Sequence, residues 1–308
     1  MIISVSRRTD IPAFYAQWFM NRIRQGYALV RNPFYPEQIS RVTLTPEAVD
    51  ALVFITRNPG PFLPYLDELE GRGYRYCFQC TLTGYPAVLE PHVPTCREAI
   101  RLLQRLSERI GPEKLTWRFD PIVISSISQE EAIITRFEAI AAKLEGCSRR
   151  VIVSFVDYYR KVQARFRYLT QAEGITFTDL HAEPERLHAL AGRIAAIARK
   201  RGMEIFACAE KDDLSAEGIA RSRCIDDGYL SRVLGISLRV GKAKNQRPDC
   251  GCSESQDIGQ YDTCLHGCAY CYATKSLPAA LRNYSQHDPH SPCLVGHCRE
   301  EDSRGGTP

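Results

Sequence analysis

Three cysteines lie within eight residues near the C-terminal end of the chain, at Cys264, Cys268 and Cys271. Thiolates bind soft or borderline metals, and cysteine is the usual protein ligand of [4Fe–4S] clusters. A loop with three thiols supplies three of the four ligands and leaves one iron open. A structural zinc ion is the alternative, but such a site is closed by four ligands and only His266 lies within the loop to complete the set. The spacing therefore favours an iron–sulfur cluster.

The Cys-x3-Cys-x2-Cys spacing, with Tyr270 directly before the last cysteine, resembles the signature of the radical S-adenosylmethionine (radical SAM) superfamily. The local string Cys-x-His-Gly-Cys-x-Tyr-Cys-Tyr-Ala is similar to that of the spore photoproduct lyase branch. Over nearly its whole length the chain also resembles an uncharacterised bacterial family described only as a domain of unknown function. Residues 6–12, 31–34, 117–121 and 257–261 carry this second resemblance.

The superfamily resemblance implies a specific reaction. The open iron would bind the amino and carboxylate groups of S-adenosylmethionine, with Tyr270 among the cofactor-binding residues. An electron from an external donor, such as flavodoxin or ferredoxin, would cleave the cofactor, and the 5′-deoxyadenosyl radical would abstract hydrogen from a substrate. The resemblance also implies that the cluster is oxygen-sensitive. In such enzymes the cofactor supplies the hard chemistry and the protein supplies binding and orientation.

Three function hypotheses stay open. The net charge is only +4 and the sequence has no run of basic residues, so a small-molecule substrate is favoured over a nucleic acid. The alternative within the same class is a nucleic-acid lesion repair enzyme that resembles spore photoproduct lyase. A third hypothesis, from another class, is a binding protein that zinc or a cluster stabilises and that performs no redox chemistry.

Six apolar runs alternate with amphipathic stretches over the first 210 residues, a pattern that predicts α/β structure with a parallel sheet. Because no Gly-x-Gly-x-x-Gly follows the first run, we expect a partial (β/α)6 TIM-like barrel rather than a doubly wound sheet. The expected strands are 2–6, 52–56, 74–81, 115–119, 151–155 and 204–209, and the expected helices are 12–25, 61–70, 95–110, 129–144 and 183–201.

Polar side chains follow each expected strand, where a parallel barrel places its active site. Arg118 and Asp120 are the candidate catalytic residues, and Arg7, Arg8 and Asp10 are candidate cofactor-binding residues, since the cofactor carries a carboxylate, an ammonium and ribose hydroxyls. Ion pairing among these residues at the strand ends is the simpler alternative.

The cysteine loop stands in an unusual place. Radical SAM enzymes carry it after the first strand of the barrel, whereas here it starts at residue 264 of 308. We therefore predict a circularly permuted barrel, which is tolerable because domain termini often lie close together. The other interpretation is an unrelated metal site.

Thirteen cysteines are many for a cytoplasmic protein, and seven of them fall between residues 208 and 271. Cys208, Cys224, Cys250 and Cys252 are enough to bind a second [4Fe–4S] cluster; a structural zinc ion and unligated thiols are the alternatives. We interpret Cys293 and Cys298 as an incidental pair, with a metal site as the alternative.

The composition is that of an ordinary globular protein, with 44% apolar residues and 25% charged residues. No apolar run reaches the roughly 18 residues that a membrane helix requires, and the first residues lack the order of a signal peptide. We therefore expect a cytoplasmic protein without a membrane partner. The expected domains are a barrel core (1–210), a cysteine-rich segment that carries the cluster loop and packs on the barrel mouth (211–283) and a polar tail (284–308).

Overall fold

The computed structural model describes residues 1–244, 250–299 and 301, so part of the expected polar tail lies outside the described residues. The chain forms two compact units. The first unit contains Met1–Phe78, Ser255–Gly267 and Ala273–Pro308, and the second contains Gln79–Glu254 and Cys268–Tyr272. The division into three domains that the sequence suggests stays a prediction.

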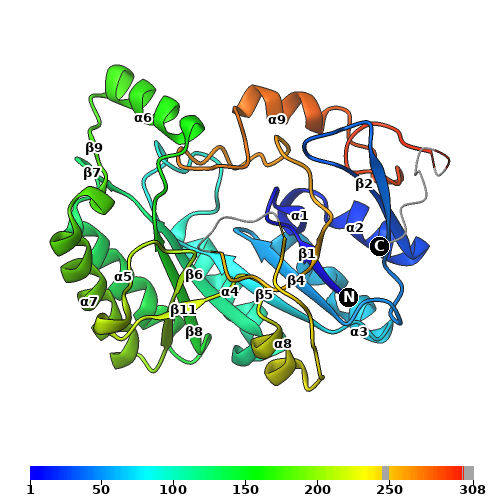
Figure 1. Ribbon diagram of the computed structural model, residues 1–308, viewed down its shortest axis with the longest axis horizontal. Helices are drawn as coiled ribbons and strands as arrows, with labels where there is room; N and C mark the ends of the chain where they lie inside the picture. Colours follow the sequence, from blue (N-terminus) through cyan, green and yellow to red (C-terminus); the bar gives the residue numbers. More distant parts are fainter. Residues whose placement is uncertain (245–249, 300, 302–308) are drawn as a thin grey trace. The chain divides into compact units, whose positions relative to one another are not determined.

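A parallel sheet of eight strands is the main element of this mixed α/β protein (Figure 1). All six strands expected from the sequence are present in it, and β12 and β11 are added at its edges. The strands in order across the sheet are β11 (Ala220–Ser222), β10 (Glu204–Cys208), β8 (Arg150–Phe155), β6 (Leu115–Ile122), β5 (Tyr76–Thr81), β4 (Ala51–Thr56), β1 (Ile2–Val5) and β12 (Gln256–Asp257).

The order of the strands shows how the sheet is wound. From β1 to β11, each strand that follows in the chain is added on the same side of the previous one. A doubly wound sheet would reverse direction at a switch point, and this sheet does not. Only β12 departs from the rule, because it returns from the C-terminal part of the chain to pair in parallel with β1, Ser4 opposite Asp257. The absence of a dinucleotide-binding fingerprint had favoured a partial (β/α)6 barrel over a doubly wound sheet, and the closure of the sheet into a barrel stays a prediction.

In the first unit, short helices follow β1 and β4. The helix α1 begins after Asp10, whose side chain accepts a hydrogen bond from the Ala13 amide, and Pro12 stands in its first turn. The helix α2 ends at Gly26, whose φ of 77° lets the chain turn away. The helical segments of this unit are α1 (Ile11–Phe14), α2 (Ala16–Gln25), η1 (Gly60–Tyr65), α3 (Leu66–Gly71) and α9 (Leu277–Tyr284).

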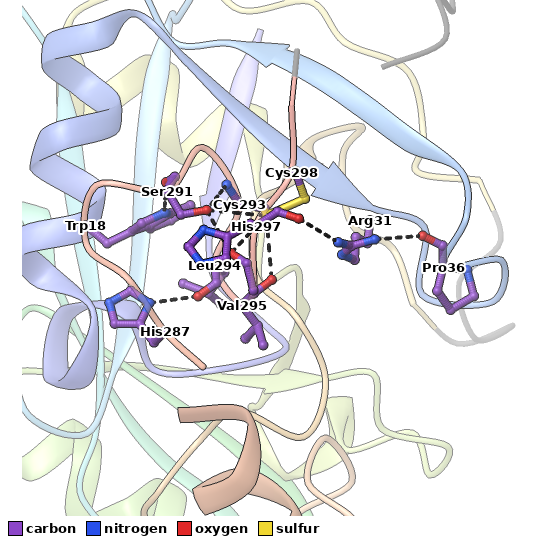
Figure 2. Close-up of a disulfide and its surroundings, with 11 residues drawn as sticks. Trp18, Arg31, Pro36, His287, Ser291, Cys293, Leu294, Val295, His297 and Cys298 are labelled. Atoms are coloured by element: carbon purple, nitrogen blue, oxygen red, sulfur yellow. Dashed lines mark hydrogen bonds between the residues drawn. A yellow bond between two sulfur atoms is a disulfide. The ribbon is translucent and has the colours of Figure 1, made fainter. Parts of the chain in front are cut away.

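A hairpin of β2 (Tyr27–Arg31) and β3 (Ile39–Thr43) packs with the C-terminal segment of the first unit. Leu29 and Ile39 form a small apolar cluster with Cys293 and Cys298, which are joined in a disulfide with a Cα–Cα distance of 5.9 Å. Figure 2 shows this disulfide beside Trp18, whose indole donates to the Ser291 carbonyl at 3.0 Å. The expected incidental pair is thus covalently bonded, and neither the hairpin nor the bond was expected from the sequence.

Longer amphipathic helices alternate with the strands of the second unit. The helix α4 begins with a capping box in which Thr95 and Glu98 exchange hydrogen bonds. The helices α5 and α7 lie side by side (Figure 1). The helical segments are α4 (Cys96–Ile110), η2 (Pro112–Lys114), α5 (Glu130–Leu144), α6 (Arg160–Glu173), η3 (Leu180–Ala182), α7 (Pro184–Lys200), η4 (Ser215–Glu217) and α8 (Asp227–Leu234); β7 (Ile124–Ser125) and β9 (Phe177–Thr178) form a small antiparallel pair.

Among the described residues, no helix combines the length and the apolar character needed to cross a bilayer.

Gly259 gives a stability prediction for the contact between β1 and the chain that follows β12. A methyl group added at Gly259 would lie 2.0 Å from the Ser6 hydroxyl oxygen and 2.6 Å from its Cβ. We expect Gly259→Ala to lower the free energy of unfolding by about 1–3 kcal/mol, the usual cost of overpacking, in a urea titration. Gly71→Ala is the control, because nothing lies within 4 Å of its added methyl group. Equal midpoints for the two variants would contradict the prediction.

Candidate functional site

Asp257, at the end of β12, is a hydrogen-bonding centre of the first unit. It is buried, and its carboxylate lies 3.6 Å from the Arg7 guanidinium, so the pair is partly shielded from water. Its four hydrogen-bond donors are Ser4 Oγ at 3.1 Å, Ser6 Oγ at 2.6 Å, the Arg7 amide at 2.8 Å and the Gly259 amide at 2.9 Å. A two-residue strand is thus fixed against β1 by its side chain as well as by its backbone.

Arg8 lies beside the same turn. Its guanidinium donates to the Gly259 carbonyl at 3.4 Å and lies 5.6 Å from the centre of the Tyr261 ring. Arg7 and Arg8, the two arginines predicted to bind a cofactor, therefore contact residues 257–261, which precede the cysteine loop. Their role toward a cofactor stays a prediction.

Asp10 is a second buried carboxylate in the first unit. It caps α1 and also accepts from Thr56 Oγ1 at 2.6 Å and from the Arg57 amide at 2.7 Å. His266, from the cysteine loop, places Nε2 2.8 Å from the carboxylate, and its ring packs on Phe14 with 4.7 Å between ring centres. The observed contacts of Asp10 join α1, β4 and the cysteine loop, so the residue has a structural role whether or not it binds a cofactor.

The base of the cysteine loop is closed within the first unit. The Asp262 amide donates to the Ala273 carbonyl at 3.1 Å, and the Asn283 side chain donates to the Asp262 carbonyl at 2.7 Å. The Tyr15 hydroxyl donates to the carbonyl of Thr263, beside Cys264, at 2.7 Å. Burial raises the pKa of Tyr15, so this hydroxyl keeps its proton and remains a donor. Cys264 is half-buried and forms no disulfide.

The second unit contains the other two cysteines of the loop. The Cys271 amide donates to the Cys268 carbonyl at 3.1 Å, so Cys268-x2-Cys271 forms a tight turn. The Ala269 amide donates to the Leu89 carbonyl at 2.9 Å. The Arg165 guanidinium donates to the Ala269 carbonyl at 2.7 Å and also to the Cys271 carbonyl. Cys268 is buried and Cys271 half-buried, and neither forms a disulfide. Gly267 precedes the turn with a φ of 71°, a conformation that glycine adopts without strain.

Tyr270 lies between these two cysteines with its side chain buried in the second unit. Its hydroxyl donates to Glu90, which also accepts from the Thr83 hydroxyl, and its ring packs edge-on against Tyr85. These contacts fix the loop; the proposed contact of Tyr270 with a cofactor stays a prediction.

Arg118 and Asp120, the candidate catalytic pair, lie on β6 and form a buried ion pair. Arg118 also donates to Gln79 Oε1 at 2.8 Å and to Cys224 Sγ at 3.2 Å, and Ser154 donates to Asp120. Burial opposes the charge of Arg118, but the Asp120 carboxylate and the nearby thiols outweigh it, and the pKa of Arg118 is raised well above its usual value. The arrangement is a fixed positive charge beside sulfur.

Four thiols gather next to Arg118 in the second unit: Cys208, Cys224, Cys250 and Cys252. Cys208 Sγ lies 2.8 Å from Cys224 Sγ, and Cys252 lies near enough to Cys224 and Cys250 to influence their charge. Hydrogen bonds from its neighbours lower the pKa of Cys224, whereas the same contacts and burial raise those of Cys208 and Cys252. The structure thus brings together the set that the sequence proposed for a second cluster; what the set binds stays a prediction.

A further group of ligand-like side chains in the second unit was not expected from the sequence. His181 Nδ1 lies 2.7 Å from Asp212 and 3.6 Å from Glu210, which is buried directly after β10. Burial raises the pKa of Glu210 despite its hydrogen bonds from the Phe155 and Lys211 amides. The position of Glu210 after a strand was the available signal; His181 comes from a distant segment and gave none.

The predicted residues fall into two groups by unit. Arg7, Arg8, Asp10 and Cys264 belong to the first unit. The second unit contains the rest, namely Arg118, Asp120, Cys208, Cys224, Cys250, Cys252, Cys268, Tyr270 and Cys271.

Comparison with known proteins gives one match. No curated protein and no solved structure matches the chain. A protein-family model covers residues 2–273, a range that includes both cysteine sets and every candidate site residue. The chain belongs to the family described as "Domain of unknown function (DUF1848)".

Proposed function

We propose that the protein is a radical SAM enzyme in which Cys264, Cys268 and Cys271 hold a [4Fe–4S] cluster. Its finer fold would be a partial (β/α)6 barrel in circularly permuted order. A small molecule is the favoured substrate, and an external donor such as flavodoxin or ferredoxin would supply the electron.

The position of β12 carries the proposal. In the superfamily that the loop resembles, the cysteines follow the first barrel strand. Here they follow β12, which pairs in parallel with β1 at the edge of a singly wound sheet. That edge is where the first strand of a permuted barrel belongs, because moving this strand to the end of the sequence leaves its neighbours unchanged.

The cysteine loop fits a three-thiolate cluster. Ten residues separate Asp262 from Ala273, and the hydrogen bond between them closes the loop at its base. Cys268 and Cys271 lie on one tight turn, a spacing common among cluster ligands. The four thiols near Arg118 offer a separate and complete set, so they are not needed to finish this one.

The protein would position and shield the cofactor. When bound, the cluster and S-adenosylmethionine supply reductive cleavage and hydrogen-atom abstraction. Arg165 and Lys161 donate to carbonyls of Ala269, Cys271 and Tyr272, so positive charge lies beside the loop that carries the thiolates. The contact between His266 and Asp10 and the contact between Tyr270 and Glu90 each fix one flank of the loop, which limits its movement during turnover.

Anaerobic reconstitution tests the proposal. We expect the wild-type chain to bind about four iron and four sulfide ions at this loop, and to release 5′-deoxyadenosine when dithionite and S-adenosylmethionine are added. The variant with Cys264→Ala, Cys268→Ala and Cys271→Ala should lose this iron and release no nucleoside. Cys147→Ala, which removes a half-buried thiol elsewhere, should behave as wild type.

Two results would contradict the proposal. One is a reconstituted wild-type chain that holds zinc but no iron at this loop, which would support a binding protein without redox chemistry. The other is a loaded cluster that never releases the nucleoside. Salt-dependent binding to DNA or RNA would instead redirect the substrate class toward nucleic-acid repair.

A further inference from the structure

Two of the four thiols near Arg118, Cys208 and Cys224, are closer together than the ligands of a second iron–sulfur cluster would be. Cys208 Sγ and Cys224 Sγ are 2.8 Å apart, and Cys252 lies near enough to Cys224 and Cys250 for the charges of their thiols to influence one another. In a [4Fe–4S] cluster each thiolate binds a different corner iron, so the sulfurs point at separate metals and stand well apart. The 2.8 Å between Cys208 Sγ and Cys224 Sγ is too short for two thiolates that bind different corners of one cubane.

One tetrahedral ion requires a different arrangement. Zinc–sulfur bonds are about 2.3 Å long, so the sulfurs of a four-cysteine site are separated by roughly 3.8 Å. Cys208 and Cys224, whose sulfurs are already in contact, reach this spacing by a small outward movement. All four ligand positions are also filled by the protein, as in structural zinc sites, and no position is left for a substrate.

The supporting contacts are those of a preformed metal site. Cys208 ends β10 and Cys224 follows β11, so two ligands stand on neighbouring strands. The other two lie on a segment held by backbone hydrogen bonds, from the Ala243 amide to the Cys252 carbonyl at 2.8 Å and from the Ser253 amide to the Ile225 carbonyl at 2.9 Å.

Charge around the sulfurs is also compensated. The Arg118 guanidinium donates to Cys224 Sγ at 3.2 Å, and the backbone of Ile225 lies beside Cys252. Four thiolates around one divalent ion carry an excess negative charge, which the guanidinium helps to offset. Hydrogen bonds of this kind orient and stabilise metal-bound thiolates.

We infer that Cys208, Cys224, Cys250 and Cys252 form a closed, structural site for a single zinc ion. The ion ties the ends of β10 and β11 to the segment at 250–252. The site is independent of the cluster loop at 264–271, and it replaces the second iron–sulfur cluster that the sequence suggested.

Metal analysis of the full-length chain tests this assignment. We expect about one zinc ion per chain in the wild type, and a loss of about tenfold or more in the variant with Cys250→Ser and Cys252→Ser. The variant lacking Cys264, Cys268 and Cys271 should keep its zinc, and so should Cys147→Ser. If the loop at 264–271 binds no cluster, the proposed function fails, but the zinc content that depends on Cys250 and Cys252 stays the same.

Cobalt substitution tests the site in the wild-type chain, so the result does not depend on whether a cysteine variant folds. Wild-type chain reconstituted with Co²⁺ alone should show the intense visible bands of a tetrahedral ion and strong sulfur-to-cobalt charge transfer. Iron and sulfide that disappear together with Cys250 and Cys252 would overturn the assignment. So would a metal-free wild-type chain in which mass spectrometry finds Cys208 bonded to Cys224, or a cobalt complex without thiolate bands.

Discussion

Arg118→Met is expected to lower the free energy of unfolding by about 3–5 kcal/mol, the usual effect of breaking one side of a buried ion pair. The guanidinium is 9% exposed and the Asp120 carboxylate 15%, so water cannot replace the lost partner well. Gln79 and Cys224 lose a donor at the same time. Urea unfolding followed by circular dichroism measures the change.

Two further variants isolate the cause of this loss. In the double variant with Arg118→Met and Asp120→Asn, the unpaired charge is gone, so we expect part of the stability to return. Arg149→Met removes a guanidinium that is 57% exposed and 3.5 Å from Glu113, and it should cost less than about 1 kcal/mol. A loss at position 118 as small as that at 149 would contradict the structural role of the pair.

Asp10→Ala is expected to cost about 3 kcal/mol or more, because several buried donors lose one acceptor. The Thr56 hydroxyl, the Arg57 amide and the cap of α1 all depend on this carboxylate. Loss of a helix cap alone accounts for about 1 kcal/mol. Because His266 also contacts Asp10, we expect hydrogen–deuterium exchange to increase in the cysteine loop as well as at the start of α1.

Asp50→Ala is the matched control for this prediction. Asp50 pairs with the N-terminal ammonium group at 2.6 Å, but both groups are exposed, and the expected loss is below about 1 kcal/mol. A loss of that size at Asp10, or unchanged exchange in the cysteine loop, would show that the carboxylate does not hold these segments together.

Strands with a strong local pattern could be predicted from the sequence. The six that were expected are four to eight residues long, rich in apolar residues and followed by polar turns. The strand β12 has only two residues, Gln256 and Asp257, and no periodicity can appear over that length. The hairpin strands β2 and β3 have the sequences YALVR and ISRVT, with no strict alternation of apolar and polar residues, so their pattern gave little signal.

The candidate site shows the same limit. Cysteine number and spacing were sufficient to group Cys208 with Cys224, Cys250 and Cys252, although not to decide between one metal ion and a cluster. That choice depends on sulfur–sulfur distances, which only a folded chain defines. The contacts of Asp257 with Ser4 and Ser6 join residues more than 250 positions apart, and no local pattern records such a pairing.

The edge position of β12 has a consequence for biosynthesis. The ribosome makes β1 first, yet Asp257 follows Ser4 by 253 residues. Until β12 has been synthesised, the side of β1 that it covers presents unpaired backbone groups. Such an exposed strand edge is a template for aggregation, which the nascent chain or a chaperone must cover. The cluster proposed for the cysteine loop would accordingly be inserted only after Cys271 has been synthesised.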